Sequence, residues 1–353
     1  MKKWAMPRRW RRQLTIWLCV CVVLTFRKST PAGMIRPGLR RVRLLRCAMT
    51  RPFFEWPPDM KVLVLGATGL LGTEVMKALT ARGIRALGAA RSGADLKVDV
   101  TDPMSLFLLL TRVDAEAVIN CAANIDLAAC EADPEAAYRI NGAPAGVLAA
   151  WSNQTDGRFI QVSTDNYFMG ETPARHNETA VVSLVNAYAA SKFSGESMAR
   201  EASNSLIVRT NICGARKGFG RWVIDSLRNR APIGAFTDYF TSTMHVTHCA
   251  EALVDLLKSK HTGLVNLASR DVSSKDEFIR AVANMMDINP DWIEPRSIAD
   301  LRPTRATSCG LDVTRVEHWL GRPMPTLKQT VCTLVDEDSS CVTPTTSKLA
   351  TAS

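Results

Sequence analysis

From Met60 onward, short runs of apolar residues alternate with longer segments in which apolar residues recur at helical spacing. The apolar runs are typical of strands buried on both faces of a parallel sheet, and we expect them at 61–65, 84–89, 116–121, 158–163 and 205–210. Segments with one apolar face predict helices at 70–82, 103–112, 134–152, 187–203, 219–230, 247–258, 275–286 and 325–337. This order predicts an α/β fold with a doubly wound parallel sheet, whose ligands bind at the carboxyl ends of the strands.

The two ends of the chain lie outside this pattern. The net charge of the 353 residues is +10, but residues 1–59 hold 14 Lys/Arg against two acidic residues. Residues 60–353 are nearly neutral, with 30 Lys/Arg against 32 Asp/Glu, so we predict no nucleic-acid partner for them. The segment 338–353 is rich in Ser and Thr and is predicted to be a disordered tail. The fold is therefore expected at 60–337.

The basic N-terminal extension contains an apolar run from Leu14 to Phe26 behind a group of basic residues, a layout that resembles a signal peptide. Its 13 residues are fewer than the roughly 20 that a helix needs to span a membrane. Arginines beyond the run and the lack of a clear cleavage site argue against export. We interpret 1–59 as lying outside the fold, with Met60 as the real start; a membrane-proximal anchor is the alternative.

The ten cysteines show no paired spacing typical of disulfides or zinc sites. This usage favours a reducing compartment, and we predict a cytoplasmic location. His245 and His248 have no Cys or His pair nearby in the sequence, so we interpret them as loop or core histidines. No metal site is predicted.

The first predicted strand leads into a glycine-rich turn. Gly66, Gly69 and Gly72 follow the apolar run at three-residue spacing, and an amphipathic helix comes next. Glycines in this context allow a tight turn and let the backbone approach a pyrophosphate, whose charge the helix N-terminus stabilises. The motif predicts a dinucleotide site; a strand-to-helix turn without a ligand is the alternative.

Tyr188 and Lys192 are four residues apart on a predicted helix, so they share one face. A lysine ammonium beside a phenol favours the phenolate, and we expect Lys192 to lower the pKa of Tyr188. A tyrosine tuned in this way can donate a proton to a carbonyl oxygen. Thr164, at the end of a neighbouring strand, is expected to hydrogen-bond the same oxygen. An ordinary helix surface is the alternative interpretation of the Tyr-x-x-x-Lys pattern.

Together, the glycine turn, Thr164, Tyr188 and Lys192 resemble the extended short-chain dehydrogenase/reductase superfamily. Within it, the chain is similar to the dTDP-4-dehydrorhamnose reductases, the RmlD-like sugar-nucleotide-binding family. The stretches that carry this similarity are 118–123, 131–141, 163–170 and 209–210. The resemblance implies a Rossmann, NAD(P)-binding domain, a smaller C-terminal substrate lobe mainly from 211–324, and a homodimer.

The end of the second strand bears on the choice of cofactor. Arg91 and Ser92 stand where an NAD enzyme usually has an acidic residue, and both side chains suit a 2′-phosphate. NADPH is therefore expected; NADH is the alternative if Arg91 is only a solvated loop charge. Asp99 is expected at the adenine edge. The predicted cofactor-binding residues are Gly66, Thr68, Gly69, Leu70, Leu71, Gly72, Arg91, Ser92, Asp99, Val100, Cys121, Ala122, Ala123, Tyr188 and Lys192.

The resemblance implies a reductase that transfers hydride from NADPH to the C4 carbonyl of a 4-keto-6-deoxy nucleotide sugar, with Tyr188 as the proton donor. Four stretches depart from the family pattern on the substrate side, so the sugar itself stays open; they are 127–131, 166–167, 211–214 and 240–243. Two alternatives are a non-catalytic regulatory subunit, like that of methionine adenosyltransferase, and a sugar-nucleotide epimerase.

Overall fold

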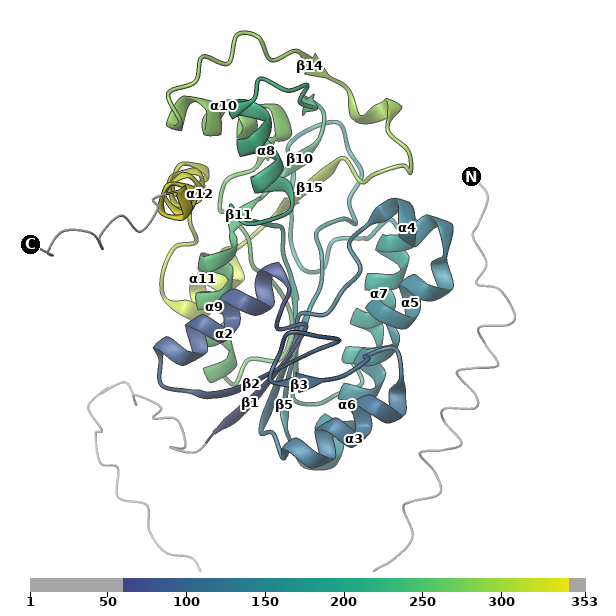
Figure 1. Cartoon of the computed structure of the whole chain (residues 1–353). Coiled ribbons are helices and arrows are strands. Elements are labelled where there is room, and N and C mark those ends of the chain that lie inside the picture. The colour runs from purple at the N-terminus through teal and green to yellow at the C-terminus, as the bar shows by residue number, and fades with distance from the viewer. Residues whose placement is uncertain (1–59, 343–353) are drawn as a thin grey trace, which may run out of the picture. The chain divides into compact units, whose positions relative to one another are not determined.

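A seven-stranded parallel sheet forms the centre of the computed structural model, which describes residues 60–342. The strands lie in the order β12-β7-β5-β4-β1-β2-β3 (Figure 1). Their bounds are β1 Lys61–Leu65, β2 Arg85–Ala90, β3 Leu96–Lys97, β4 Ala117–Asn120, β5 Arg158–Val162, β7 Ser205–Arg209 and β12 Gly263–Asn266. The order reverses between β1 and β4, which is the arrangement of a doubly wound Rossmann fold. The predicted fold class is confirmed.

Alternate residues of β1 are buried on opposite faces of the sheet. Val62 and Val64 belong to a core with α2 (Leu70–Ala81) and α9 (Val246–Lys258). Leu63 and Leu65 belong to a second core with α3 (Pro103–Val113) and α6 (Ala143–Thr155). Because both faces of the sheet are covered, its strands are apolar at successive positions. This continuous apolar pattern is what allowed the strands to be predicted from the sequence.

Two predicted helices, 134–152 and 187–203, differ from the observed helices by more than two residues at one end. The predicted helix 134–152 is two helices, α5 (Pro134–Asn141) and α6. Pro144 has no N–H to continue a single hydrogen-bond ladder, so a new helix begins at Ala143 with the proline in its first turn. The predicted helix 187–203 ends earlier, because α7 spans Ala187–Ala199. β12 and a short helix, α4 (Leu127–Ala132), were not predicted.

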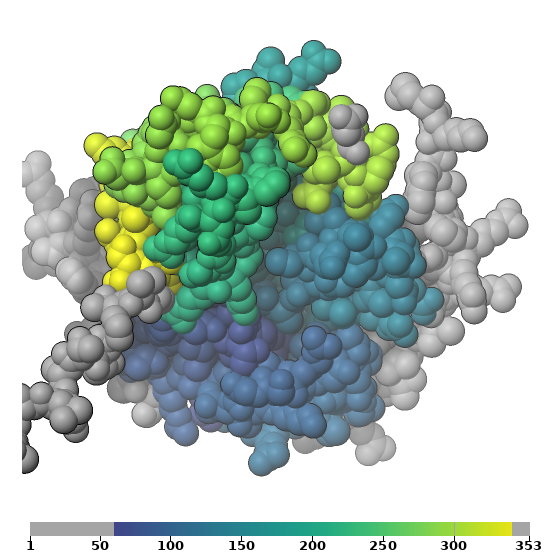
Figure 2. Space-filling model, turned by 45° about the horizontal axis from the view of Figure 1, so that its top comes forward, coloured from purple at the N-terminus to yellow at the C-terminus, as the bar shows by residue number. Residues whose placement is uncertain are grey.

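Further elements lie beyond the carboxyl ends of the sheet (Figure 1), and their atoms, coloured green to yellow, form the upper part of the face shown in Figure 2. A four-stranded sheet has the order β13-β10-β15-β6, with β6 Arg175–His176, β10 Phe240–Thr241, β13 Ser273–Ser274 and β15 Ser308–Leu311. Two strand pairs join β8 (Ile212–Cys213) to β11 (Met244–His245) and β9 (Ala235–Phe236) to β14 (Pro295–Arg296). The helices of this region are α8 (Phe219–Arg228), α10 (Lys275–Met285), η1 (Ile298–Asp300) and α12 (Leu327–Val342). β6 shows that residues before 211 also contribute to this region, which we call the substrate lobe. A further helix, α11 (Thr314–Leu320), packs on the central sheet against β12 and α9.

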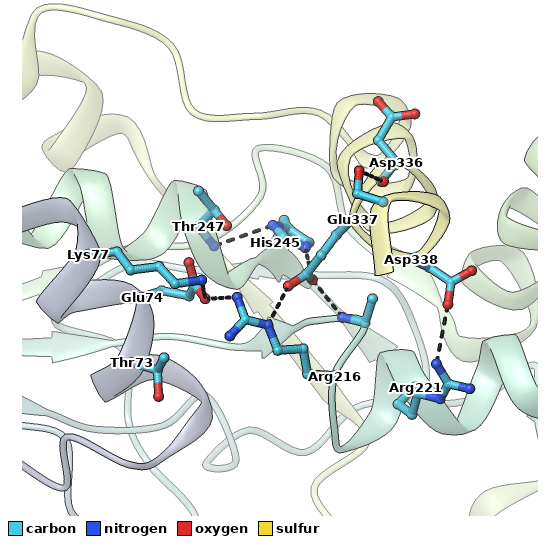
Figure 3. A network of polar contacts seen from close by, with 12 residues as sticks. Thr73, Glu74, Lys77, Arg216, Arg221, His245, Thr247, Asp336, Glu337 and Asp338 are labelled. Carbon is cyan, nitrogen blue, oxygen red and sulfur yellow. Dashed lines mark hydrogen bonds and ion pairs between the residues drawn. The ribbon is translucent and has the colours of Figure 1, made fainter. Parts of the chain in front are cut away.

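The last helix continues past the predicted start of the tail. α12 runs to Val342, and Asp338 inside it is 1 % exposed. The Asp338 carboxylate forms ion pairs with Arg221 and Arg228 of α8, the first of which is drawn in Figure 3. The prediction of a disordered tail beginning at residue 338 is therefore wrong, because this acidic residue is buried and paired. The interpretation of 1–59 lies outside the described residues. None of the helices described in 60–342 combines the length and the apolar composition that a membrane span requires.

Candidate active site

The glycine turn between β1 and α2 is packed so closely that side chains do not fit. Gly66 has φ +73°, and a Cβ there would lie 2.7 Å from the backbone nitrogen of Ala122. A Cβ on Gly72 would lie 2.2 Å from the carbonyl oxygen of Gly66. Gly69 caps α2 without a side-chain hydrogen bond, which leaves the first N–H groups of the helix available to an anion. The turn therefore fits a dinucleotide pyrophosphate.

The other predicted cofactor residues lie around this turn. Cys121, Ala122 and Ala123 directly follow β4, which pairs with β1. Arg91 and Ser92 are exposed after β2, and a Cβ on Gly93 would lie 3.6 Å from the Thr68 side chain, so this loop lies against the turn. Asp99 is exposed, and hydrogen bonds from Thr101, together with the charge of Arg91, lower its pKa. Its contact with adenine stays a prediction.

Thr164 and Tyr188 meet at the carboxyl end of β5. Thr164 follows this strand by two residues, and Tyr188 lies in the first turn of α7. Asn186 begins the helix, because its side chain accepts a hydrogen bond of 2.8 Å from the backbone N–H of Ala189. The Thr164 side chain lies close enough to the Tyr188 phenol to influence its pKa, and both residues are buried. The structure thus brings the predicted hydroxyl pair together.

Lys192 lies one turn further along α7, as the spacing predicts, but its ammonium has a different partner. It donates a hydrogen bond of 2.7 Å to the carbonyl oxygen of Val162. Burial raises the pKa of Tyr188 to about 12, against the opposing influence of the nearby Thr164 side chain, and lowers the pKa of Lys192 to about 8. The expected lowering of the tyrosine pKa by Lys192 is therefore wrong for this structure, because desolvation of the phenol outweighs any favourable charge.

A buried ion pair between α7 and β7 lies next to the site residues. Glu196, one turn beyond Lys192, accepts hydrogen bonds of 2.9 and 2.8 Å from Nε and Nη2 of Arg209. Ser163, next to Thr164, donates to the same carboxylate at 2.7 Å. The pair therefore connects α7 to the ends of β5 and β7.

A polar network ties the helix after the glycine turn to the substrate lobe (Figure 3). Arg216 forms ion pairs with Glu74 of α2 at 2.7 Å and with Glu337 of α12 at 3.2 Å. His245 Nε2 lies 3.1 Å from Glu337 Oε2, and burial lowers the histidine pKa. His248 is on α9 and is partly buried. His245 therefore acts in this network as a structural side chain.

Asp165 and Lys275 were not predicted as site residues, and hydrogen bonds through Asn211 and Thr243 link them. Asp165 has a signal in the sequence, because it follows Thr164 directly. Lys275 comes from the substrate lobe, where the strict alternation of strands and helices fades. A capping box of Ser274 and Glu277 predicts where α10 begins, but it does not predict that Lys275 is buried.

A doubly wound sheet with a glycine turn at its first strand, and a Thr/Tyr/Lys set at the carboxyl ends, defines a short-chain dehydrogenase/reductase. Comparison with known families narrows this class. The chain matches the RmlD substrate binding domain over residues 60–340 and belongs to that family. The recognition made from the sequence motifs is confirmed.

Several named relatives are reductases. The chain is 33 % identical over 294 residues to the "Probable low-salt glycan biosynthesis reductase Agl14" of Haloferax volcanii, covering 78 % of this chain and 97 % of that one. It is 29 % identical over 272 residues to the dTDP-4-keto-6-deoxy-D-glucose reductase of Streptomyces niveus, covering 73 % and 93 %. Membership of an oxidoreductase family, predicted from the motifs, is confirmed by these relatives.

A solved structure shows the same fold. The dTDP-4-dehydrorhamnose reductase of Bacillus anthracis, crystallised in complex with NADP, superposes with a TM-score of 0.72 at 22 % identity. The match covers 79 % of this chain and 98 % of that one. At this identity the likeness concerns the fold.

Proposed function

We propose that the chain is an NADPH-dependent reductase of the C4 carbonyl of a 4-keto-6-deoxy nucleotide sugar. The observation that carries the proposal is the neighbouring pair of Thr164 and Tyr188 hydroxyls, buried at the carboxyl end of the sheet. Two hydroxyl groups held in this way can bind one carbonyl oxygen. The names of the relatives supply the substrate class.

NADPH fits the residues around the first two strands. The turn from Gly66 to Gly72 would hold the pyrophosphate. Its backbone is packed so tightly that a Cβ at Gly66 or Gly72 would clash with other backbone atoms, and a turn without side chains lets the pyrophosphate approach the backbone. Arg91 would hold the 2′-phosphate, since its planar donor groups match phosphate oxygens. When bound, the reduced nicotinamide supplies the hydride.

The residues of the chain supply the proton and orient the substrate. The high pKa of Tyr188, about 12, keeps the phenol protonated at neutral pH, so it arrives at the reaction as a proton donor. Thr164 donates a hydrogen bond to the same oxygen as negative charge develops on it. Lys192 holds the end of β5 through Val162 and places a positive charge near the site. We also expect the Lys192 ammonium to contact the ribose of the bound cofactor.

Tyr188→Phe tests the proposal, because it removes the phenolic hydroxyl and keeps the ring. We expect turnover of dTDP-4-dehydrorhamnose, followed as NADPH oxidation, to fall on the order of 10²- to 10⁴-fold. The NADPH dissociation constant should stay unchanged. Tyr138→Phe on α5 is the matched control, and it should keep full activity.

The other outcomes identify the alternatives. NADPH binding without turnover of any nucleotide sugar would contradict the proposal and favour a regulatory subunit. Inversion at a sugar carbon without net NADPH oxidation would favour an epimerase. The predicted cytoplasmic location and homodimer stay predictions, to be checked by fractionation and light scattering.

A further inference from the structure

A buried lysine of the substrate lobe is connected to the catalytic pair by an unbroken series of hydrogen bonds. Lys275, the first residue of α10, donates from Nζ to Thr243 Oγ1 at 3.1 Å. Thr243 donates to Asn211 Oδ1 at 2.8 Å. Asn211 donates from Nδ2 to Asp165 Oδ2 at 2.8 Å. The series therefore ends on the carboxylate next to the catalytic threonine.

The other oxygen of Asp165 faces the catalytic threonine. Thr164 Oγ1 donates a hydrogen bond of 3.4 Å to Asp165 Oδ1, and the Thr164 side chain also lies beside the phenol of Tyr188. A threonine hydroxyl has a single proton to donate. An ionised Asp165 accepts this proton in the free enzyme and so holds the Thr164 side chain in one orientation beside the phenol. Once substrate binds, the hydroxyl turns to the substrate oxygen, which becomes the stronger acceptor as negative charge develops on it.

The position of Lys275 is unusual for a lysine. Its side chain is 6 % exposed, and its ammonium lies over the rings of Phe219, at 4.2 Å from the centroid, and Tyr239, at 5.4 Å. Burying an ammonium is unfavourable unless other groups compensate. The rings and the Thr243 hydroxyl compensate in part, and the nearby negative charge of Asp165 adds to them. The lysine and the carboxylate therefore stabilise each other's charged forms.

The charges around Asp165 support this interpretation. Burial raises the pKa of Asp165 to about 6, and the charge of Lys275 is the largest influence that opposes this rise. Burial lowers the pKa of Lys275 to about 8, and Asp165 opposes that change. Both groups are therefore charged between about pH 6 and 8. The other titratable groups that interact with the pair are Tyr188, Tyr239, Cys213, Cys309 and Arg305.

We propose that Lys275 is a positioning residue for the reduction, which keeps Asp165 ionised and so fixes Thr164 beside the catalytic tyrosine. The inference rests on the proposed function. Because an amide stands in the series at Asn211, the series holds side chains in place and does not carry protons. It connects a helix of the substrate lobe to the catalytic groups on β5 and α7.

The pH dependence of kcat in full-length variants tests the inference. Wild type should lose activity as the pH falls through the pKa of Asp165. In Lys275→Met the cation is gone, so this pKa rises and the acid limb of the profile moves to higher pH. At pH 6.5 we expect kcat to fall on the order of tenfold to a hundredfold, with an unchanged NADPH dissociation constant. Lys275→Arg should keep the acid limb in place, and Lys328→Met on the exposed face of α12 is the control.

An acid limb of Lys275→Met that coincides with that of wild type would overturn the inference while leaving the proposed function intact. Thr243→Val covers the case in which Lys275→Met does not fold, because it breaks the series and retains the charge. It should lower kcat with little change in KM, and an unchanged kcat would overturn the inference. Wild type without turnover of any nucleotide sugar would instead refute the proposed function and the inference together.

Discussion

Glu196→Gln removes one charge of the ion pair behind the active site and leaves the other in place. Glu196 is fully buried, and Arg209 is 2 % exposed. Two of the guanidinium nitrogens donate to this carboxylate, and a third, Nη1, has no hydrogen-bond partner among the described residues. The guanidinium also lies over the rings of Tyr167 and Phe168. No other carboxylate forms an ion pair with Arg209 among the described residues, so the substitution leaves a buried cation uncompensated.

The expected effect is large. Breaking a buried ion pair on one side costs about 3–5 kcal/mol, a substantial part of the roughly 5–15 kcal/mol by which proteins are stable. For a domain of this size each kcal/mol lowers the melting temperature by about 2–4 °C, so we expect a fall of about 6–20 °C. Urea unfolding followed by tryptophan fluorescence measures the free energy directly.

Two controls separate charge from packing. Arg200 lies 3.9 Å from the same carboxylate but is 48 % exposed, so Arg200→Met should cost less than about 1 kcal/mol. Replacing both partners, as Glu196→Leu with Arg209→Met, removes the uncompensated charge and should restore much of the lost stability. A loss below about 1 kcal/mol in Glu196→Gln would refute the reasoning.

Three further predictions concern the cofactor site and the last helix. Gly72→Ala places a Cβ 2.2 Å from the Gly66 carbonyl oxygen, so the turn must shift. NADPH should then bind at least about tenfold more weakly. An unchanged NADPH dissociation constant would contradict the packing argument. Arg91→Ala removes charge-assisted hydrogen bonds to the 2′-phosphate, worth about 1.5–3 kcal/mol, and should reduce kcat/KM for NADPH about 10- to 100-fold. The kcat/KM for NADH should stay unchanged. Equal losses with both cofactors would show that Arg91 does not bind the 2′-phosphate. Asp338→Asn leaves two half-exposed arginines of α8 without their buried carboxylate partner. It should lower the free energy of unfolding, measured by urea titration, by about 1–3 kcal/mol. An unchanged free energy would show that α12 does not unfold cooperatively with the rest of the fold.

The sequence by itself determined the elements that depend on near neighbours. The apolar runs predicted five strands of the sheet, because strands buried on both faces have no polar positions to obscure them. The glycine spacing predicted the turn after β1, since Gly66 and Gly72 meet within a few residues of each other. The four-residue spacing of Tyr188 and Lys192 placed them on one helix face for the same local reason.

Only the tertiary structure decided the properties that come from distant parts of the chain. The pKa of Tyr188 rises because surrounding segments exclude water from the phenol, and no local pattern carries that information. Lys275 and Asp338 would ordinarily be read as exposed charges, yet each is buried. Lys275 lies over aromatic rings, whereas Asp338 is paired with two arginines more than 100 residues away in sequence. The burial of a group and its pKa depend on the residues that pack around it in the folded chain. The fold could therefore be predicted from the sequence, whereas the electrostatics of the site could not.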